Sequence, residues 1–499
     1  MATDDKYDRQ LRLWGREGQS RLSTSRICVL GSSGLSSEIL KNLVLPGIGF
    51  FTIIDNHQIT ESDLGNNFFI TLNNLSHSRS ETVKSFLLEL NSDVHGESLH
   101  KSFEEILTLP DFFSSFDLII ATQLKFSQIK RLASICEGLN KTLIVAKSIG
   151  LIGYLRVYSQ EHLVVESKPS DKEFFDLRLH KPFDELLAYC DSVNFEELKE
   201  IEHAHVPFVV ILVKVLKEWV DIHGHSPSNF EEKTRFKQMV KSKSRNYSNE
   251  LNFQEACEKS YLCCLVSEAS EEVFSVLQDP KSLNASDSSE EFWKCARSIS
   301  QFYTQNKVLP LSGLFSDMTS DTNSYISLQT IYKSKSQSDL QQVSSIYSSL
   351  FSTPVPDLLE NFCKNIFMIE VTRYRSFTEE FECLNGTVFE DPDEIEYKVV
   401  DWYLGLRVFE DFAEEKGRNA GIDDLDLLQD NSEKLGKRVE KDVLEEILRF
   451  GNSELHSVSA LLGGVASQEV VKLVTKQFSP INNTFLFTGV TSNACVFEL

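Results

Sequence analysis

One stretch near the N-terminus constrains the fold more than any other: ICVLGSSGLSSEILKNLVLPGIGFFTIID, residues 27–55. A short apolar run leads into a glycine-containing turn, then a segment with apolar residues at helical spacing, then a second apolar run that ends at Asp55. This succession predicts a strand, a helix and a parallel strand, the unit from which dinucleotide-binding domains are built. Further strand-like runs alternate with helical segments as far as about residue 166, so we expect an α/β domain with a parallel sheet.

The glycine pattern of the first turn is incomplete for nucleotide binding. A dinucleotide fingerprint reads GxGxxG, because one glycine makes the turn, the next admits the phosphate and the last allows close helix packing. In this register Gly31 is kept, while Ser33 and Ser36 stand at the other two glycine positions. Asp55 remains where a ribose-binding acid belongs. The stretch predicts the fold but gives little support for a bound nucleotide, and it disfavours a hydride-transferring oxidoreductase.

The rest of the chain differs from this first part in the spacing of its apolar residues. Between about 167 and 450, apolar residues recur mostly at helical spacing, interrupted by serine-rich polar stretches that are typical of surface loops. From 451 onward a glycine pair precedes a helical segment, followed by the strand-like segments NNTFLFTGV and ACVFEL. The pattern predicts one α/β domain built from 1–166 and 451–499, with a mainly helical insertion at 167–450.

Composition argues against several kinds of partner. The net charge of −24 disfavours a nucleic acid or an anionic membrane. No apolar run is long enough to span a bilayer, and the polar N-terminus shows no secretory signal, so we expect a cytoplasmic or nuclear protein. The cysteines form no CxxC pair, and the HAH stretch at 203–205 has no third ligand nearby, so we expect no metal site.

Four longer motifs carry a resemblance to a known family. They are YDRQLRLWG at 7–15, LKNLVLPGIG at 40–49, IIDNHQITESDLGNNFF at 53–69 and GGVASQEVVKLVTKQFSPINN at 463–483. Together they resemble the adenylation-domain family that activates ubiquitin-like proteins. The resemblance implies a Rossmann-like, ThiF-type fold. It also implies an ATP-dependent reaction in which the C-terminal glycine of a modifier is adenylated and the modifier is then transferred to a cysteine.

The chain departs from the ATP site of that family at most positions. Asn66 stands where the family has an arginine, Asn67 where it has a glutamine, Arg79 where it has a lysine and Gln123 where it has a magnesium-binding aspartate; only Asp55 matches. A neutral amide is a poor ligand for magnesium, and Asn66 brings no positive charge to the phosphates. The resemblance therefore implies a pseudo-adenylation domain that binds no ATP and no metal of its own.

The YDRQ motif has a different meaning in this family. In family dimers its arginine contacts the phosphates of the ATP bound in the other subunit, so the resemblance implies that Arg9 acts in trans on the ATP and magnesium of a partner. An arginine fork can neutralise charge that develops during transfer. A competing interpretation is that Arg9 forms an exposed ion pair. Tyr7, Gln10 and Trp14 are expected to pack at the dimer interface or in the core.

Cysteines in the helical insertion are not expected to be catalytic. Cys257, Cys263 and Cys264 lie in EACEKSYLCCLV, and Cys363 lies in LLENFCKNIF, in each case among apolar residues. A buried cysteine behaves as a small hydrophobic residue, and none of the four resembles the catalytic-cysteine motif of the family. We expect the insertion to be half of a catalytic-cysteine-type domain without its cysteine.

Taken together, the resemblance implies a regulatory, non-catalytic subunit of a heterodimeric activating enzyme. The partner is expected to be the catalytic subunit, which carries both adenylation and thioester formation, and the modifier is expected to be the neddylation type destined for cullin ligases. An equivalent subunit for a SUMO-type modifier is disfavoured, because such subunits look shorter and lack most of the insertion. Two further hypotheses stay open: a pure scaffold without a role in ATP chemistry, and a complete single-chain activating enzyme.

Overall fold

The computed structural model describes residues 6–165, 176–264, 270–384, 386 and 395–499. The chain divides into two compact units, one formed by Met1–His162 together with Val371–Leu499 and the other by Leu163–Glu370. We call them the sheet unit and the helical unit. The chain passes from one to the other through a two-stranded ribbon of β7 (His162–Val164) and β8 (Glu370–Thr372).

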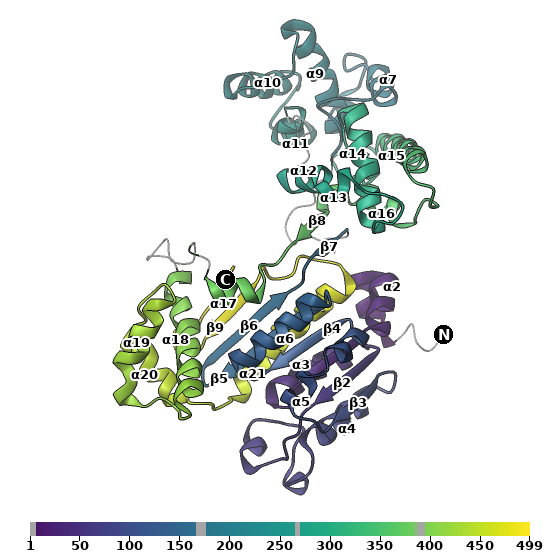
Figure 1. The fold of residues 1–499 in the computed structure, drawn as a ribbon. Helices are drawn as coiled ribbons and strands as arrows, with labels where there is room; N and C mark the ends of the chain where they lie inside the picture. Colours follow the sequence, from purple (N-terminus) through teal and green to yellow (C-terminus); the bar gives the residue numbers. More distant parts are fainter. Residues whose placement is uncertain (1–5, 166–175, 265–269, 385, 387–394) are drawn as a thin grey trace. The chain divides into compact units, whose positions relative to one another are not determined.

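The sheet unit is organised around eight strands in the order β10-β9-β6-β5-β4-β1-β2-β3 (Figure 1). Its parallel part comprises β1 (Arg26–Leu30), β2 (Phe50–Ile54), β3 (His95–Leu99), β4 (Leu118–Thr122) and β5 (Thr142–Ile149). The antiparallel part comprises β6 (Ile152–Tyr158), β9 (Thr484–Thr488) and β10 (Asn493–Phe497). The predicted Rossmann-like α/β fold is confirmed, and β1 lies between β2 and β4, where the order of connection reverses.

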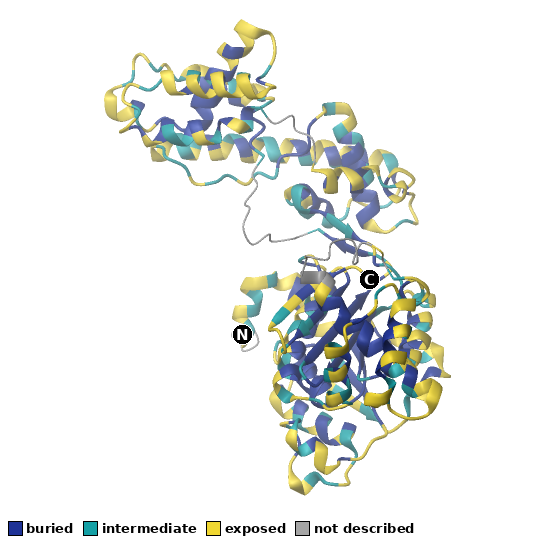
Figure 2. Cartoon of the chain, turned by 90° about the vertical axis from the view of Figure 1, so that its left-hand side faces the viewer, coloured by how far each residue is buried: buried dark blue, intermediate teal, exposed yellow. Residues whose placement is uncertain are grey.

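Amphipathic helices bury the faces of this sheet. Helix α3 (Gly34–Val44) packs along α21 (His456–Thr475), and both contact β5. Helix α4 (Arg79–Leu90) contacts β2 and β3, and α6 (Phe126–Gly138) contacts β5. Figure 2 shows the strands buried and the outer faces of the helices exposed. Helix α21 is long and apolar enough to cross a bilayer, but 56% of its most apolar window is buried, as in a core helix.

The segment from Val371 to Phe450 packs in the sheet unit, which corrects the expected boundary of the insertion. It contains α17 (Phe377–Glu382), α18 (Ile395–Lys416), α19 (Leu425–Lys434) and α20 (Lys441–Phe450). On β6, Arg156 forms a fully buried ion pair of 2.7 Å with Glu380, and Tyr154 stacks on Tyr403 of α18. The insertion therefore runs over 163–370 rather than 167–450. The periodicity of 371–450 is helical in either case, so it could not reveal which unit these helices cover.

The helical unit has its own core, to which the long apolar helix α9 (Phe208–His223) contributes most. The other helices of at least seven residues are α7 (Asp184–Ser192), α10 (Phe230–Ser242), α11 (Leu251–Glu258), α12 (Glu271–Gln278), α14 (Glu291–Asn306), α15 (Thr322–Leu350) and α16 (Leu358–Lys364). His203 of the HAH stretch is buried, with Nδ1 2.6 Å from Glu250 Oε1. Over the described ranges, no group of three or more His, Cys, Asp and Glu side chains could hold a metal ion.

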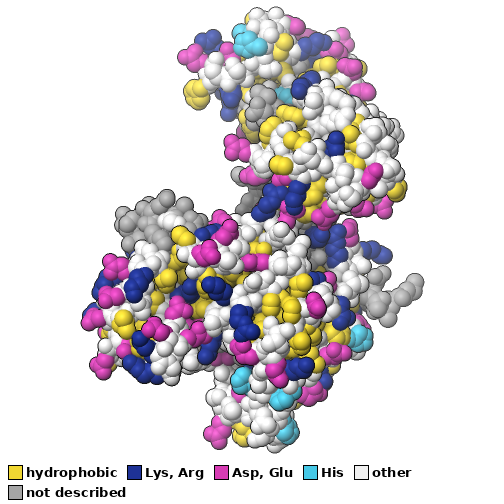
Figure 3. All heavy atoms as spheres, viewed as in Figure 1, with side chains coloured by type: hydrophobic (Ala, Val, Ile, Leu, Met, Phe, Trp, Pro, Cys, Tyr) yellow, Lys and Arg dark blue, Asp and Glu magenta, His cyan; other side chains and the backbone are white. Residues whose placement is uncertain are grey.

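Charge is distributed rather than concentrated on the face drawn in Figure 3. Acidic and basic side chains are interspersed there, over both the sheet unit and the helical unit. On this face, the net charge of −24 is therefore not gathered into one acidic patch.

Candidate functional site

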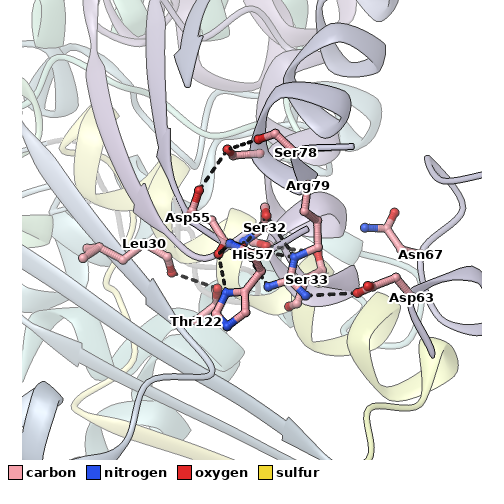
Figure 4. Close-up of polar contacts among 12 residues, drawn as sticks. Leu30, Ser32, Ser33, Asp55, His57, Asp63, Asn67, Ser78, Arg79 and Thr122 are labelled. Carbon is pink, nitrogen blue, oxygen red and sulfur yellow. Dashed lines mark hydrogen bonds and ion pairs between the residues drawn. The ribbon is translucent and has the colours of Figure 1, made fainter. Parts of the chain in front are cut away.

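The turn after β1 keeps its first glycine for a reason internal to the fold. Gly31 has a φ of +109°, and a Cβ at this position would lie 2.3 Å from Thr122 Oγ1 at the end of β4. That hydroxyl donates a 3.0 Å hydrogen bond to the carbonyl oxygen of Leu30 (Figure 4). The close approach of β1 and β4 requires glycine here whether or not a nucleotide binds.

Asp55 lies fully buried at the end of β2, surrounded by donors from its own chain (Figure 4). Its Oδ2 accepts from Ser32 Oγ at 2.5 Å, and from Arg79 Nη2 and Nε at 2.7 and 3.1 Å. Its Oδ1 accepts from the His57 backbone N–H at 2.9 Å and lies 2.5 Å from His57 Nδ1. Arg79 is held on its other side by a 3.0 Å ion pair with Asp63. The acid expected at a ribose is thus fully engaged within the chain.

The pKa shifts of Asp55 and Arg79 also indicate that these two side chains stabilise each other's charge. Burial by itself would raise the pKa of Asp55, but the hydrogen bond from His57, the charge of Arg79 and the hydrogen bond from Ser32 hold that pKa well below its usual range. Burial would likewise lower the pKa of Arg79, and the charge of Asp55 raises it instead. Each charged group is stabilised by its neighbours, so Asp55 is not left free for a ribose and Arg79 is not left free for a phosphate.

The two asparagines that follow β2 form part of the wall of the site. Asn67 is buried, with Nδ2 3.0 Å from Ser37 Oγ in α3 and Oδ1 accepting from the Phe69 N–H at 3.0 Å. The carbonyl oxygen of Asn66 lies directly over Gly34, where a Cβ would approach it to 2.4 Å. This part of the chain therefore covers the start of α3, where a phosphate would have to approach.

Gln123 and the substituted serines also form hydrogen bonds within the chain. Gln123 donates from Nε2 to the carbonyl oxygen of Ser148 at 2.8 Å and accepts from the Ser148 N–H at 3.0 Å. The Ser36 hydroxyl donates to the carbonyl oxygen of Ser33 at 3.0 Å. The side-chain amide of Gln123 therefore pairs with the backbone of Ser148 in β5, as the peptide group of a neighbouring strand would. A neutral amide that is bound in this way does not fit a magnesium site.

The N-terminal helix α2 (Asp8–Thr24) is anchored on both sides of Arg9. Tyr7 donates from its hydroxyl to Asp93 at 2.9 Å and accepts from Asn91 at 3.0 Å. Trp14 donates to Gln19 at 2.9 Å, and its carbonyl oxygen accepts from Gln477 at 3.0 Å. These contacts fix the start of the helix within the sheet unit.

Between these anchors, the side chain of Arg9 is exposed, and it makes no hydrogen bond or ion pair within the part of the chain that the structure describes. Arg12, one turn further along, is paired with Asp8 at 2.8 Å. The exposed ion pair considered for Arg9 is therefore not formed with any described residue. Gln10 is half-buried on the same turn.

Comparison with known proteins decides which family has this arrangement. The ThiF family matches residues 7–498. The chain belongs to the ThiF family. Within it, the chain is 38% identical to "NEDD8-activating enzyme E1 regulatory subunit AXL" of Arabidopsis thaliana, over 97% of both chains. It is 34% identical to the "NEDD8-activating enzyme E1 regulatory subunit" of Xenopus laevis, over 99% of this chain and 98% of that one. The predicted membership in the group of regulatory subunits is confirmed.

The four cysteines considered in the helical insertion of this ThiF-family chain are poorly suited to a thioester. Cys257, Cys263 and Cys363 are buried, and Cys264 is half-buried. Burial raises the pKa of the Cys363 thiol to about 12 and that of Cys263 well above its usual range. The thiolate is the nucleophile in such reactions, so these side chains remain inert thiols at neutral pH. Their expected packing role agrees with this placement.

Sequence reasoning missed several residues that complete this ThiF-family site. Ser32 and His57 bind Asp55, and Asp63 binds Arg79. All three lie inside motifs in which other residues were predicted to form the site. Glu454 was also missed, although its Oε1 accepts from the N–H of Leu35 at 2.5 Å. The two residues are 419 positions apart in the sequence, and no motif links them.

Proposed function

We propose that this chain is the regulatory subunit of a heterodimeric NEDD8-activating enzyme and has no adenylating activity of its own. The observation that carries the proposal is full-length similarity to proteins named as such regulatory subunits, at 33–38% identity for several of them. In this proposal the chain pairs with a catalytic subunit, which adenylates the C-terminus of the ubiquitin-like modifier and forms the thioester.

The state of the degenerate site supports the absence of a nucleotide on this chain. The charges that could meet a ribose or a phosphate, on Asp55 and Arg79, neutralise each other, and Gln123 is bound to backbone. These residues do not fit ATP and magnesium, which in this proposal are bound by the partner.

Arg9 is the residue that we propose contributes directly to the partner's chemistry. It is exposed at the start of a helix that Tyr7 and Trp14 fix to the sheet unit, and no described residue neutralises its charge. A guanidinium carried on a fixed stretch of backbone can bind the phosphates of ATP in another subunit. A pure scaffold would not need this residue.

The first test measures ATP–pyrophosphate exchange with the modifier present, for the chain alone and for the reconstituted pair. We expect exchange from the pair and none from the chain alone. A thioester assay on a non-reducing gel should place the modifier on the partner. Exchange by the isolated chain, or a reducible adduct on it, would contradict the proposal. Activity with a SUMO-type modifier but not with NEDD8 would favour the SUMO-type assignment instead.

The second test addresses Arg9 with a matched control on the same helix. Arg9→Ala should lower the exchange rate of the assembled pair by about 10² or more, the range seen when a donor to a developing charge is removed. Arg12→Ala removes another exposed arginine of the same helix, which is paired with Asp8, and should leave the rate unchanged. Equal rates for Arg9→Ala and Arg12→Ala, with normal assembly, would show that the chain acts only as a scaffold.

A further inference from the structure

The start of helix α3 is the part of the fold that should attract an anion. The first N–H groups of a helix have no partner within it, and they carry the positive end of the helix dipole. In dinucleotide-binding folds this helix N-terminus binds the pyrophosphate. In this chain, the N-cap residue Ser33 makes no side-chain capping bond, and the first turn contains no acidic residue. Something else must satisfy these groups.

Glu454 supplies the missing negative group. Its Oε1 accepts from the Leu35 N–H at 2.5 Å and from the Ser33 hydroxyl at 3.3 Å. The Ser459 hydroxyl donates to the same oxygen at 2.8 Å. Burial raises the pKa of Glu454, and the hydrogen bonds from these three donors offset part of that rise. The carboxylate is thus coordinated much as a phosphate oxygen would be at this position.

The backbone around Glu454 is fixed on both sides. The segment Gly451–Leu455, which we call the strap, connects α20 to α21 and crosses the end of β5, where the Gly150 N–H donates to the carbonyl oxygen of Ser453 at 2.7 Å. Just after the strap, His456 Nδ1 lies 3.1 Å from the carbonyl oxygen of Asn66. The ring of Phe68 packs edge-on against His456 at 3.9 Å between centroids. Glu454 is therefore held at the start of α3 by neighbours on either side.

We propose that Glu454 is a built-in anion that occupies the phosphate position of the degenerate site and keeps free phosphates out of it. This inference rests on the proposed absence of a nucleotide on this chain, and it names the group that enforces that absence. Loss of the family's ATP-contacting side chains removes catalysis, whereas Glu454 fills the position that a phosphate would occupy. A carboxylate tethered to the same chain competes with any free anion at a very high effective concentration.

The test measures binding of inorganic pyrophosphate to the full chain by calorimetry. Glu454→Ala should bind pyrophosphate at least tenfold more tightly than wild type, and this binding should weaken as salt is added. Glu89→Ala is the control, because Glu89 is an exposed glutamate of α4 and its removal should leave the chain like wild type. The inference is overturned if the folded Glu454→Ala chain binds no better than the Glu89→Ala chain, or if wild type already binds equally well.

A second variant covers the case in which Glu454→Ala does not fold. Glu454→Gln keeps the size of the side chain and one acceptor oxygen but loses its charge. Hydrogen exchange of the Leu35 amide should then be roughly fivefold faster than in wild type, because hydrogen bonds to charged acceptors are stronger. Unchanged exchange would overturn the inference. Both measurements use the chain alone, so a negative result leaves the exchange assay with the partner, and the role of Arg9, to stand separately.

Discussion

Arg79 donates two hydrogen bonds to the buried carboxylate of Asp55, from Nη2 at 2.7 Å and from Nε at 3.1 Å. In a nucleotide-binding domain an acid at this position would hold a ribose, and a cation near it would face phosphates. Here the two side chains hold each other, with Asp63 completing the cluster at 3.0 Å. These three side chains therefore form part of the network that stabilises the fold.

Arg79→Ala should therefore destabilise the sheet unit by about 3 kcal/mol or more, because it leaves the Asp55 charge buried without its partner. Urea unfolding of the chain, monitored by a tryptophan of the sheet unit such as Trp14 or Trp402, would measure the loss. Arg12→Ala removes an exposed pair with Asp8 and should cost little. Equal urea midpoints of unfolding for the two variants would mean that groups other than Arg79 are enough to stabilise the buried charge of Asp55.

Acid should weaken the sheet unit through Asp55. The pKa of this carboxyl in the folded chain lies well below that of the unfolded chain, so ionised Asp55 stabilises the fold above about pH 4. That stabilisation is lost progressively as the pH falls below this value. Asp55→Asn should be less stable than wild type at pH 7, with the difference shrinking as the pH falls toward 3. Parallel stability curves between pH 7 and 3 would contradict the assignment.

Titration of His57 should change the stability of the fold in the opposite direction to that of Asp55, with stability falling as the pH rises, and in a higher pH range. Its pKa is raised, mainly by the hydrogen bond to Asp55, so protonated His57 stabilises the fold below about pH 6.5. The contribution is lost as the pH rises through the folded-state pKa. His57→Ala should remove this small dependence near neutral pH and also weaken the acid limb, because the His57 side chain is one of the donors that lower the pKa of Asp55. The side chain is 60% exposed, so solvent screening keeps the effect small.

How far the sequence could predict these features depends on how local each one is. The strand–turn–helix–strand order around Gly31 follows from consecutive residues of the sequence, so the sheet and its first crossover were predictable. The substitutions at Asn66, Gln123 and Arg79 could be recognised against the family pattern. Their new partners could not, because Ser148 and Asp63 become neighbours only through the fold.

Long-range packing explains what the sequence could not indicate. Glu454 meets α3 across 419 positions, and nothing near it distinguishes it from a surface glutamate. Similarly, the apolar stripe of α18 has the same period whether it covers a sheet or another helix. Its place in the sheet unit follows from single contacts, such as the stack of Tyr403 on Tyr154 and the hydrogen bond between Tyr403 and Glu380. Such contacts leave no periodic signal.

Native-state alkylation should discriminate sharply among the ten cysteines. Cys383 is the exposed one, Cys264 is half-buried and the other eight are buried. Iodoacetamide should therefore label Cys383 first and Cys264 more slowly, with the remainder reacting only after denaturation. Mass spectrometry of peptides after timed labelling measures this order, and Cys383→Ser should abolish the fast phase. Fast labelling of Cys257 or Cys363 would reopen the question of a catalytic thiol.

The glycine pair at the centre of α21 offers a test of how closely this helix approaches α3. A Cβ on Gly463 would lie 2.7 Å from the Cβ of Glu38, whereas a Cβ on Gly464 would meet nothing within 4 Å. Gly463→Ala should thus push the two helices apart and cost about 1–3 kcal/mol. Gly464→Ala makes the identical change on the exposed side and should stabilise the helix by about 0.5–1 kcal/mol. Because α21 begins just after Glu454, separation of the helices should also lengthen the contact of Glu454 with Leu35, and Gly463→Ala alone should speed exchange of that amide. Thermal unfolding and amide exchange on the matched pair would measure both effects, and equal behaviour of the two variants would rule out the close approach.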